Sequence, residues 1–221
     1  MRFLQNATLP RALAVATPYV LLCNPNNPTA DRHPRQIVLD AAHTLHKRGG
    51  TLIVDEAFID ATPDDSLTPL AGTADAPNLI VLRSLGKFFG LAGARVGFIF
   101  AAPALLQRMA EAMGPWAVSG PARLVARLAL ADRAWQNAAR PALAAASKDL
   151  AALLAPYGEV KATPLFATLT LADAAGMHEH LARQGILTRR FDQQPLLRFG
   201  LPGNTDEQAR LQAALKAWQP T

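Results

Sequence analysis

The stretch VLRSLGKFFGLAGARVGF, residues 81–98, holds a single lysine among glycines and aromatic residues. The apolar residues 79–82 predict a buried strand, and a second apolar strand follows the loop that contains Lys87. A lysine that is withdrawn from water gives up its proton more easily, which suits an amine nucleophile. Ser84 and Arg95 add a hydroxyl and a planar cation, which are groups that bind phosphate. Taken alone, Lys87 would be interpreted as an ordinary solvated loop lysine.

Two earlier strands also end in polar residues. Residues 51–54 form a short apolar strand that ends in Asp55, and residues 19–23 form another that precedes an Asn-Pro-rich turn containing Asn27. A helical pattern and a Gly-Gly stop between these strands predict a strand–helix–strand unit with a parallel crossover. Because the carboxyl ends of parallel strands share one edge of a sheet, the amide, the carboxylate and the Lys87 loop are expected to meet where such sheets bind ligands.

Composition excludes several classes of protein. Half of the 221 residues are hydrophobic and 18% are charged, which is typical of a globular chain. The net charge of +5 is scattered along the sequence rather than clustered, so nucleic acid is not expected as a partner. The single cysteine, Cys23, excludes an internal disulfide and fits a reducing compartment. No apolar run is long enough to span a membrane, so we expect a cytoplasmic protein.

The sequence as a whole predicts two domains, which comprise residues 1–140 and residues 141–221. Residues 103–113 predict a helix, and residues 124–154 predict a long Ala/Leu-rich helix that Pro141 kinks. The end of the chain mixes strands and helices, which is typical of an α+β domain. Its elements are expected at residues 165–171, 174–184, 186–191, 196–200 and 207–218.

The combined motifs resemble those of the aspartate-aminotransferase-like (fold type I) family of pyridoxal-phosphate enzymes. The sequence around Lys87 is closest to the histidinol-phosphate aminotransferase branch, and with GPWAVSGP at residues 114–121 it is most similar to the threonine-phosphate decarboxylases of cobalamin biosynthesis. The resemblance runs from about Tyr19 onward. It implies an α/β fold with a mostly parallel sheet in the large domain and a small α+β domain at the C-terminal end.

The resemblance also implies that part of the large domain is missing. Complete relatives carry further strands, a phosphate-cradling turn and a ring-stacking aromatic ahead of the strand at residues 19–23. Residues 1–17 show little pattern of their own. We therefore expect an N-terminally truncated large domain, whether as a fragment, a shortened product or a sequence with a misplaced start, and a sheet with an exposed edge.

The resemblance implies pyridoxal phosphate as the cofactor and gives Lys87 and Asp55 catalytic roles. Lys87 matches the lysine that binds the cofactor covalently and moves protons at the substrate α-carbon. Asp55 matches the aspartate that keeps the pyridine nitrogen protonated, which makes the ring an electron sink. Ser84 and Arg95 match the phosphate anchors. From the residues alone, Ser84 could also be a turn hydroxyl and Arg95 a partner in a surface ion pair.

Asn27 and Phe58 are expected beside the ring hydroxyl of the cofactor. Asn27 matches an asparagine that hydrogen-bonds this group, although the residue alone would be interpreted as part of an Asn-Pro turn. Phe58 stands where many aminotransferases carry a tyrosine, so one hydrogen bond is lost. Ala30 replaces the usual glycine of the Asn-Pro-Thr-Gly run, which leaves the geometry of this turn open.

Two arginines near the C-terminal end are candidate substrate ligands. Arg198 matches the small-domain arginine that binds an acid group of the substrate, and its apolar strand neighbours disfavour an unpaired structural role. Arg189 is a weaker candidate for the substrate phosphate, with a solvated strand arginine as the alternative. His178 and His180 are two residues apart on a predicted helix and do not share a face, so no metal site is predicted.

The implied activity is the decarboxylation of L-threonine O-3-phosphate to aminopropanol O-phosphate by a homodimeric enzyme. A histidinol-phosphate-type aminotransferase with the same anchors is the first alternative, since the orientation of the substrate decides which bond breaks. The second alternative is a truncated, non-catalytic remnant, because the resemblance places the missing strands in the sheet and in the dimer interface.

Overall fold

The computed structural model describes residues 8–15 and 17–219, which divide into two compact units. The first unit contains the chain up to Asn26 and Arg32–Arg133, and the second contains Asn27–Asp31 and the chain from Ala134 onward. The turn Asn27–Asp31 thus groups with the C-terminal half of the sequence. The predicted domain boundary between residues 140 and 141 stays a prediction, since compactness alone does not define a domain.

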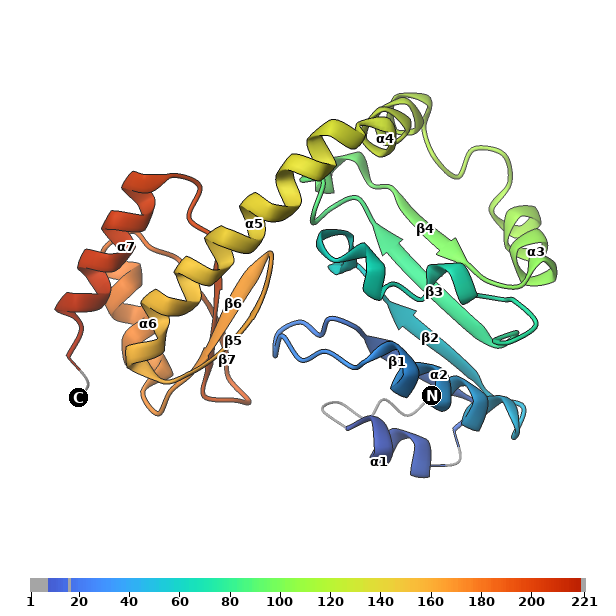
Figure 1. Ribbon diagram of the computed structural model, residues 1–221, viewed down its shortest axis with the longest axis horizontal. Helices are drawn as coiled ribbons and strands as arrows, with labels where there is room; N and C mark the ends of the chain where they lie inside the picture. Colours follow the sequence, from blue (N-terminus) through green and yellow to red (C-terminus); the bar gives the residue numbers. More distant parts are fainter. Residues whose placement is uncertain (1–7, 16, 220–221) are drawn as a thin grey trace. The chain divides into compact units, whose positions relative to one another are not determined.

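The first unit is built on a four-stranded sheet with the order β1–β2–β3–β4 (Figure 1). The strands are β1 (Tyr19–Cys23), β2 (Thr51–Asp55), β3 (Leu79–Ser84) and β4 (Gly97–Phe100). The first three are parallel and β4 is antiparallel to β3. Helix α2 (Arg35–His46) connects β1 to β2. The predicted strand–helix–strand unit and the mostly parallel sheet are confirmed.

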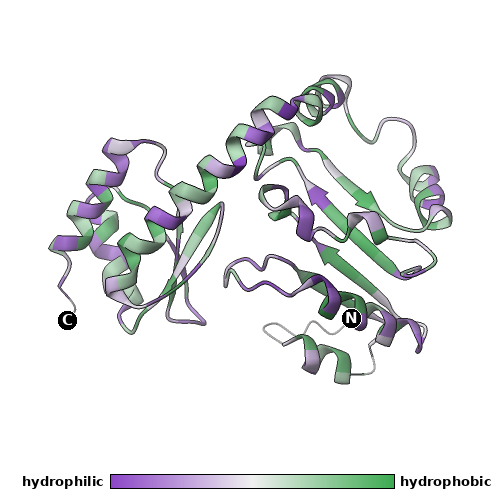
Figure 2. Ribbon diagram, viewed as in Figure 1, coloured by the Kyte–Doolittle hydropathy of each residue, from purple (hydrophilic) through white to green (hydrophobic). Residues whose placement is uncertain are grey.

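One face of this sheet is covered and the other is more open. Because strand side chains alternate between the faces, Leu52 and Val54 of β2 and Val81 of β3 point to one side, where they are fully buried in a core shared with α2. Tyr19 and Leu21 belong to the opposite face and are each 60% exposed. The strands are hydrophobic along most of their length (Figure 2).

Short helical elements fill the connections of the first unit. Helix α1 (Leu9–Ala14) begins with a proline in its first turn and was not predicted. Of the segment in which no pattern was found, residues 1–7 and 16 lie outside the described residues. Three short 3-10 helices follow β2 and a fourth precedes β4. They are η1 (Ile59–Ala61), η2 (Pro63–Asp65), η3 (Thr68–Leu70) and η4 (Ala92–Ala94).

Residues 124–154 are mostly helical, as expected, but they do not form the single long helix that was predicted. Helix α3 (Pro103–Met113) forms as expected, but two separate helices follow, α4 (Gly120–Ala131) and α5 (Arg133–Leu154). The chain leaves the helical conformation at Asp132, where ψ is 77°. Aspartate favours such breaks because its short carboxylate competes for neighbouring backbone groups. Pro141 lies inside α5, which continues through it.

The second unit contains an antiparallel sheet with the order β5–β6–β8–β7, together with helices. Its strands are β5 (Glu159–Thr163), β6 (Phe166–Thr170), β7 (Arg189–Phe191) and β8 (Leu196–Gly200), and α6 (Ala174–Arg183) and α7 (Thr205–Ala217) join α5. Leu150, Leu169, Met177, Leu197 and Leu215 meet in its core. Strand β5 was not predicted, because its residues are mostly exposed and carry little apolar signal.

Within the part of the chain that the structure describes, no helix combines the length and the apolar character that crossing a bilayer would require.

Candidate active site

Asp55 and Ser84 lie at the carboxyl ends of the neighbouring parallel strands β2 and β3, as the sequence predicted. Each side chain is oriented by the backbone that follows its strand. The Asp55 Oδ1 accepts the Ala57 N–H at 3.0 Å, and the Ser84 Oγ accepts the Gly86 N–H at 3.1 Å. Both residues are partly buried. A carboxylate and a hydroxyl are therefore presented at the same edge of the sheet.

Asp55 also acts on the neighbouring cysteine. Cys23 is its register partner on β1. Burial raises the pKa of the Cys23 thiol, and the negative charge of Asp55 raises it further. Cys23 is therefore a neutral, partly buried side chain, which fits the interpretation of this residue as part of the packing.

Lys87 follows Ser84 in a tight loop, but its side chain is exposed. The expectation of a desolvated lysine was wrong for this structure. Leu85 and Phe88 take the buried positions on either side of it, so the loop turns Lys87 outward. The ammonium lies 5.4 Å from the centroid of the Phe58 ring, within the range of a cation–π contact. Phe58 and Lys87 are thus brought together.

Arg95 ends η4 in the left-handed conformation, with φ 54° and ψ 43°. This conformation costs about 1–2 kcal/mol for a residue with a Cβ. The exposed guanidinium donates to the Ala92 carbonyl at 3.3 Å. Strained residues of this kind cluster at ligand sites, because the surrounding structure holds them there for a purpose other than stability.

Asp55, Lys87 and Arg95 form no ion pair within the described residues. No lysine or arginine pairs with Asp55, and no carboxylate pairs with Lys87 or Arg95. Their chemistry fits pyridoxal phosphate. A carboxylate suits a protonated ring nitrogen, a primary amine suits an aldehyde, and a guanidinium with a hydroxyl suits a phosphate dianion.

The second unit holds the other predicted ligands. Arg198 on β8 is the register partner of Arg189 on β7, and its Nη1 donates to the Asn27 Oδ1 at 2.5 Å. Burial lowers the pKa of Arg198, and the positive charge of Arg189 lowers it further. No carboxylate in the described chain forms an ion pair with either arginine. Asn27, Arg189 and Arg198 therefore form one cationic cluster.

Ala30 settles the question left open for the Asn-Pro turn. It adopts the left-handed conformation, with φ 58°, and is buried. Alanine thus takes the backbone conformation that glycine accepts without strain.

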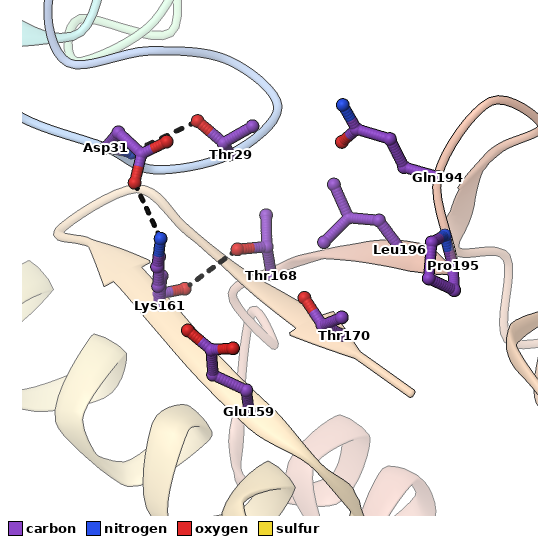
Figure 3. A pocket seen from close by; sticks show the side chains of 9 residues that line it. All are labelled: Thr29, Asp31, Glu159, Lys161, Thr168, Thr170, Gln194, Pro195 and Leu196. Carbon is purple, nitrogen blue, oxygen red and sulfur yellow. Dashed lines mark hydrogen bonds and ion pairs between the residues drawn. The ribbon is translucent and has the colours of Figure 1, made fainter. Parts of the chain in front are cut away.

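A cavity of about 240 Å³ also lies in the second unit (Figure 3). Lys161 is paired there with Asp31 at 2.8 Å, which raises the pKa of this lysine through the hydrogen bond and the carboxylate charge. The lining residues are Thr29, Asp31, Glu159, Lys161, Thr168, Thr170, Gln194, Pro195 and Leu196. Because two carboxylates accompany the one lysine, this cavity is a poorer anion site than the arginine pair.

The two histidines of α6 have separate partners. His178 Nδ1 lies 2.8 Å from the Thr188 hydroxyl, and His180 Nε2 lies 2.9 Å from the Ala214 carbonyl. The absence of a metal site stays a prediction.

Sequence reasoning missed Glu56 and Arg83, which lie next to Asp55 and Ser84. Both are charged residues at positions that continue the buried alternation of their strands after Val54 and Val81. A charge in such a position was the available signal, since it requires a buried partner.

Comparison with known proteins identifies the family. The sequence model described as aminotransferase class I and II matches residues 6–214. A threonine-phosphate decarboxylase of Pseudomonas aeruginosa is 50% identical over 198 residues, which cover 89% of this chain and 59% of that protein. A threonine-phosphate decarboxylase of Sinorhizobium sp. is 40% identical, with coverage of 92% and 61%. A histidinol-phosphate aminotransferase of Chromobacterium violaceum is 34% identical, with coverage of 89% and 55%.

Solved structures agree with this assignment. The histidinol-phosphate aminotransferase of Sinorhizobium meliloti, solved with pyridoxal 5'-phosphate, has a TM-score of 0.83 and 26% identity, and the match covers 94% of this chain and 60% of that one. The L-threonine-O-3-phosphate decarboxylase of Porphyromonas gingivalis shares the fold, with a TM-score of 0.76, 21% identity and coverage of 96% and 66%.

This chain spans about three fifths of the length of the curated relatives named above. The predicted fold class is confirmed, and pyridoxal phosphate is confirmed as the cofactor of this fold. The chain belongs to the class I and II aminotransferase family.

Proposed function

We propose that this chain supplies the cofactor-binding and substrate-binding residues of a pyridoxal-phosphate-dependent decarboxylase that acts on L-threonine O-3-phosphate. The observation that carries the proposal is the set of charged groups at the sheet edge that form no ion pair within the described residues, namely Asp55, Lys87 and Arg95. The identity of 50% to a threonine-phosphate decarboxylase supports this substrate over others.

Lys87 and Asp55 are the proposed catalytic residues. When bound, the cofactor accepts the electron pair that remains after a bond to the substrate α-carbon breaks. Lys87 would hold the cofactor at its aldehyde carbon, and its amine, once displaced there by the amine of the substrate, would carry a proton to the substrate α-carbon. Asp55, held by the Ala57 N–H, keeps a proton on the ring nitrogen. An asparagine would hold the same place without the charge that this task needs.

Four other residues anchor the cofactor in this proposal. Ser84 and Arg95 hold the phosphate, Asn27 hydrogen-bonds the ring hydroxyl, and Phe58 packs against the Lys87 side chain. The Asn27 side chain has a second role, because its Oδ1 accepts from Arg198. It therefore orients the guanidinium that we assign to the substrate.

Arg198 and Arg189 are the proposed substrate ligands. A phosphorylated amino acid carries a carboxylate and a phosphate, and two adjacent arginines without carboxylate partners suit such a doubly anionic molecule. Binding of either anion also relieves the repulsion between the two guanidinium groups.

A histidinol-phosphate-type aminotransferase is the second candidate. The 34% identity to such an enzyme favours it, and the same anchors would serve. The two activities would differ in which bond of the substrate α-carbon breaks, which the arginines that orient the substrate would decide. The homodimer and the cytoplasmic location remain predictions.

The deciding experiment is borohydride reduction of the chain in the presence of pyridoxal phosphate, followed by peptide mass mapping. We expect a cofactor adduct on the Lys87 peptide, lost in Lys87→Ala and kept in Lys148→Ala, which removes an exposed lysine of α5. Carbon dioxide release from L-threonine O-3-phosphate is then compared with amino transfer from histidinol phosphate. An adduct spread over many lysines would instead support the non-catalytic remnant.

A further inference from the structure

A buried polar cluster lies on the covered side of the sheet, next to the edge that carries Asp55 and Ser84. It joins three segments of the first unit, namely the end of β2 with η1, the start of η3, and the end of β3. We call it the Glu56–Arg83 cluster, and it consists of Glu56, Asp60, Ser66, Thr68 and Arg83.

Glu56 is the centre of the cluster and is fully buried. Its Oε2 accepts the Ser66 hydroxyl at 2.5 Å and the Thr68 hydroxyl at 3.4 Å, and its Oε1 accepts the Leu67 N–H at 2.7 Å. One carboxylate thus holds the chain between η2 and η3 against the end of β2.

Arg83 closes the cluster from β3, and its side chain is only 17% exposed. Its Nη1 donates to the Ser66 and Thr68 hydroxyls at 3.1 Å each, and its Nη2 donates to the Asp60 carboxylate. The Nη1 also lies 3.9 Å from the Glu56 Oε2. The guanidinium therefore faces two buried carboxylates, and removal of Arg83 would leave both without a cation.

The cluster and the candidate site occupy the same strand ends on opposite faces. Side chains alternate along a strand, so Asp55 and Glu56 point to opposite sides, as do Ser84 and Arg83. The Glu56 N–H donates to the Leu82 carbonyl at 2.9 Å, which extends the β2–β3 pairing to this point. The same backbone therefore carries the cluster on one side and the candidate catalytic groups on the other.

We infer that Glu56 and Arg83 are positioning residues that hold the Asp55 carboxylate and the Ser84 hydroxyl at the spacing that a bound cofactor needs. This inference rests on the proposed function. The physical reason is that strand ends fray when no side chain ties them together. A carboxylate at the ring nitrogen and a hydroxyl at the phosphate can bind the same rigid molecule only when the distance between them is fixed.

Two backbone amides report on this spacing in the chain without cofactor. The Ala57 amide is bound by the Asp55 carboxylate, and the Gly86 amide is bound by the Ser84 hydroxyl. We expect Glu56→Gln and Arg83→Lys to accelerate hydrogen exchange at both amides by about tenfold. This is the loss of protection expected when one hydrogen bond to a charged group is weakened. The matched control is Asp65→Asn, which removes only the exposed Arg32–Asp65 ion pair from the same loop. It should leave both amides unchanged.

Each outcome decides a different point. Faster exchange at Leu67 alone would overturn the inference, because Glu56 would then be a purely local clamp of the loop. Arg83→Lys keeps the cation and serves as the milder variant if Glu56→Gln does not fold. With pyridoxal phosphate added, both variants should also need about tenfold more cofactor for half-maximal adduct at Lys87. If the unaltered chain forms no such adduct, the proposed function fails, while the exchange rates still decide the positioning role.

Discussion

The sheet edge of the first unit and the arginine pair of the second differ in how they balance charge. The edge presents groups of both signs, Asp55 against Lys87 and Arg95. Asp55 is held by a backbone N–H, Arg95 has a left-handed backbone, and Lys87 lies over the Phe58 ring. The pair presents two like charges, Arg189 and Arg198, which are register partners on neighbouring strands, and Arg198 donates to the uncharged side chain of Asn27.

This difference separates two kinds of ligand. Mixed charges at fixed positions suit one rigid molecule with a cationic nitrogen, an aldehyde and a phosphate. Two adjacent guanidinium groups suit a flexible dianion, because its negative charges offset the repulsion between them. Under the proposed function, the sheet edge binds the cofactor and the arginine pair binds the substrate, so substitutions in these two parts should have different effects.

The largest effect should come from Asp55→Asn, which tests the cofactor part. Loss of the charge that holds the ring nitrogen protonated should lower the decarboxylation rate by at least about a hundredfold, the cost of removing one preorganised electrostatic partner. A second effect needs no cofactor, because Asp55 is one of the two causes that raise the pKa of Cys23. The pH at which iodoacetamide begins to alkylate Cys23 should therefore fall. An unchanged alkylation profile would contradict the contact between these residues.

A smaller effect is expected from Arg198→Lys, which tests the substrate part. Lysine keeps the charge but loses the planar fork, so KM for L-threonine O-3-phosphate should rise by about tenfold with little change in kcat. Adduct formation at Lys87 should be unaffected. Glu179→Gln, which removes an exposed ion pair on α6, serves as the control for the second unit. Loss of the Lys87 adduct in Arg198→Lys would break the division between the two parts.

Glu56 should make the stability of the chain depend on pH. Burial raises the pKa of Glu56 despite the hydrogen bonds and the Arg83 charge that oppose it. The folded chain therefore holds this proton more tightly than the unfolded chain does, and the contribution to stability is present at low pH and lost as the pH rises through the raised value. The urea concentration at half-unfolding should be measured for the unaltered chain and for Glu56→Gln. The value for the unaltered chain minus that for the variant should decrease as the pH rises over that interval. A rising difference would contradict the direction of the shift.

The first unit was predictable from the sequence because its candidate site residues directly follow apolar runs. Asp55 and Ser84 sit where hydrophobic runs stop, and the parallel order of the strands places them at one edge. The exposure of Lys87 was not predictable, since neighbouring glycines and aromatics say how a loop turns only after Leu85 and Phe88 have been packed. The Glu56–Arg83 cluster was not predicted because its members lie as many as 27 residues apart in the sequence, from 56 to 83.

In the second unit, local signals were weaker. Strand β5 has one buried residue at its end, so tertiary pairing with β6 rather than its own pattern defines it. At the end of the first unit, the helix break at Asp132 was missed because proline is the stronger sequence signal, yet α5 continues through Pro141. The pairing of Arg198 with Asn27 joins residues 171 positions apart, which no motif could have indicated.

The smallest expected effect concerns the strain at Arg95. Arg95→Gly should stabilise the chain without cofactor by about 0.5–1 kcal/mol, because glycine removes the left-handed penalty but adds freedom to the unfolded chain. Arg95→Ala keeps the penalty and should not stabilise. Both variants lack the guanidinium, so both should weaken cofactor binding to the same degree, measured by the concentration needed for half-maximal adduct at Lys87. If Arg95→Gly is more stable but binds the cofactor as well as the unaltered chain does, the Arg95 guanidinium does not bind the cofactor. The left-handed conformation at this position would then have no explanation in cofactor binding.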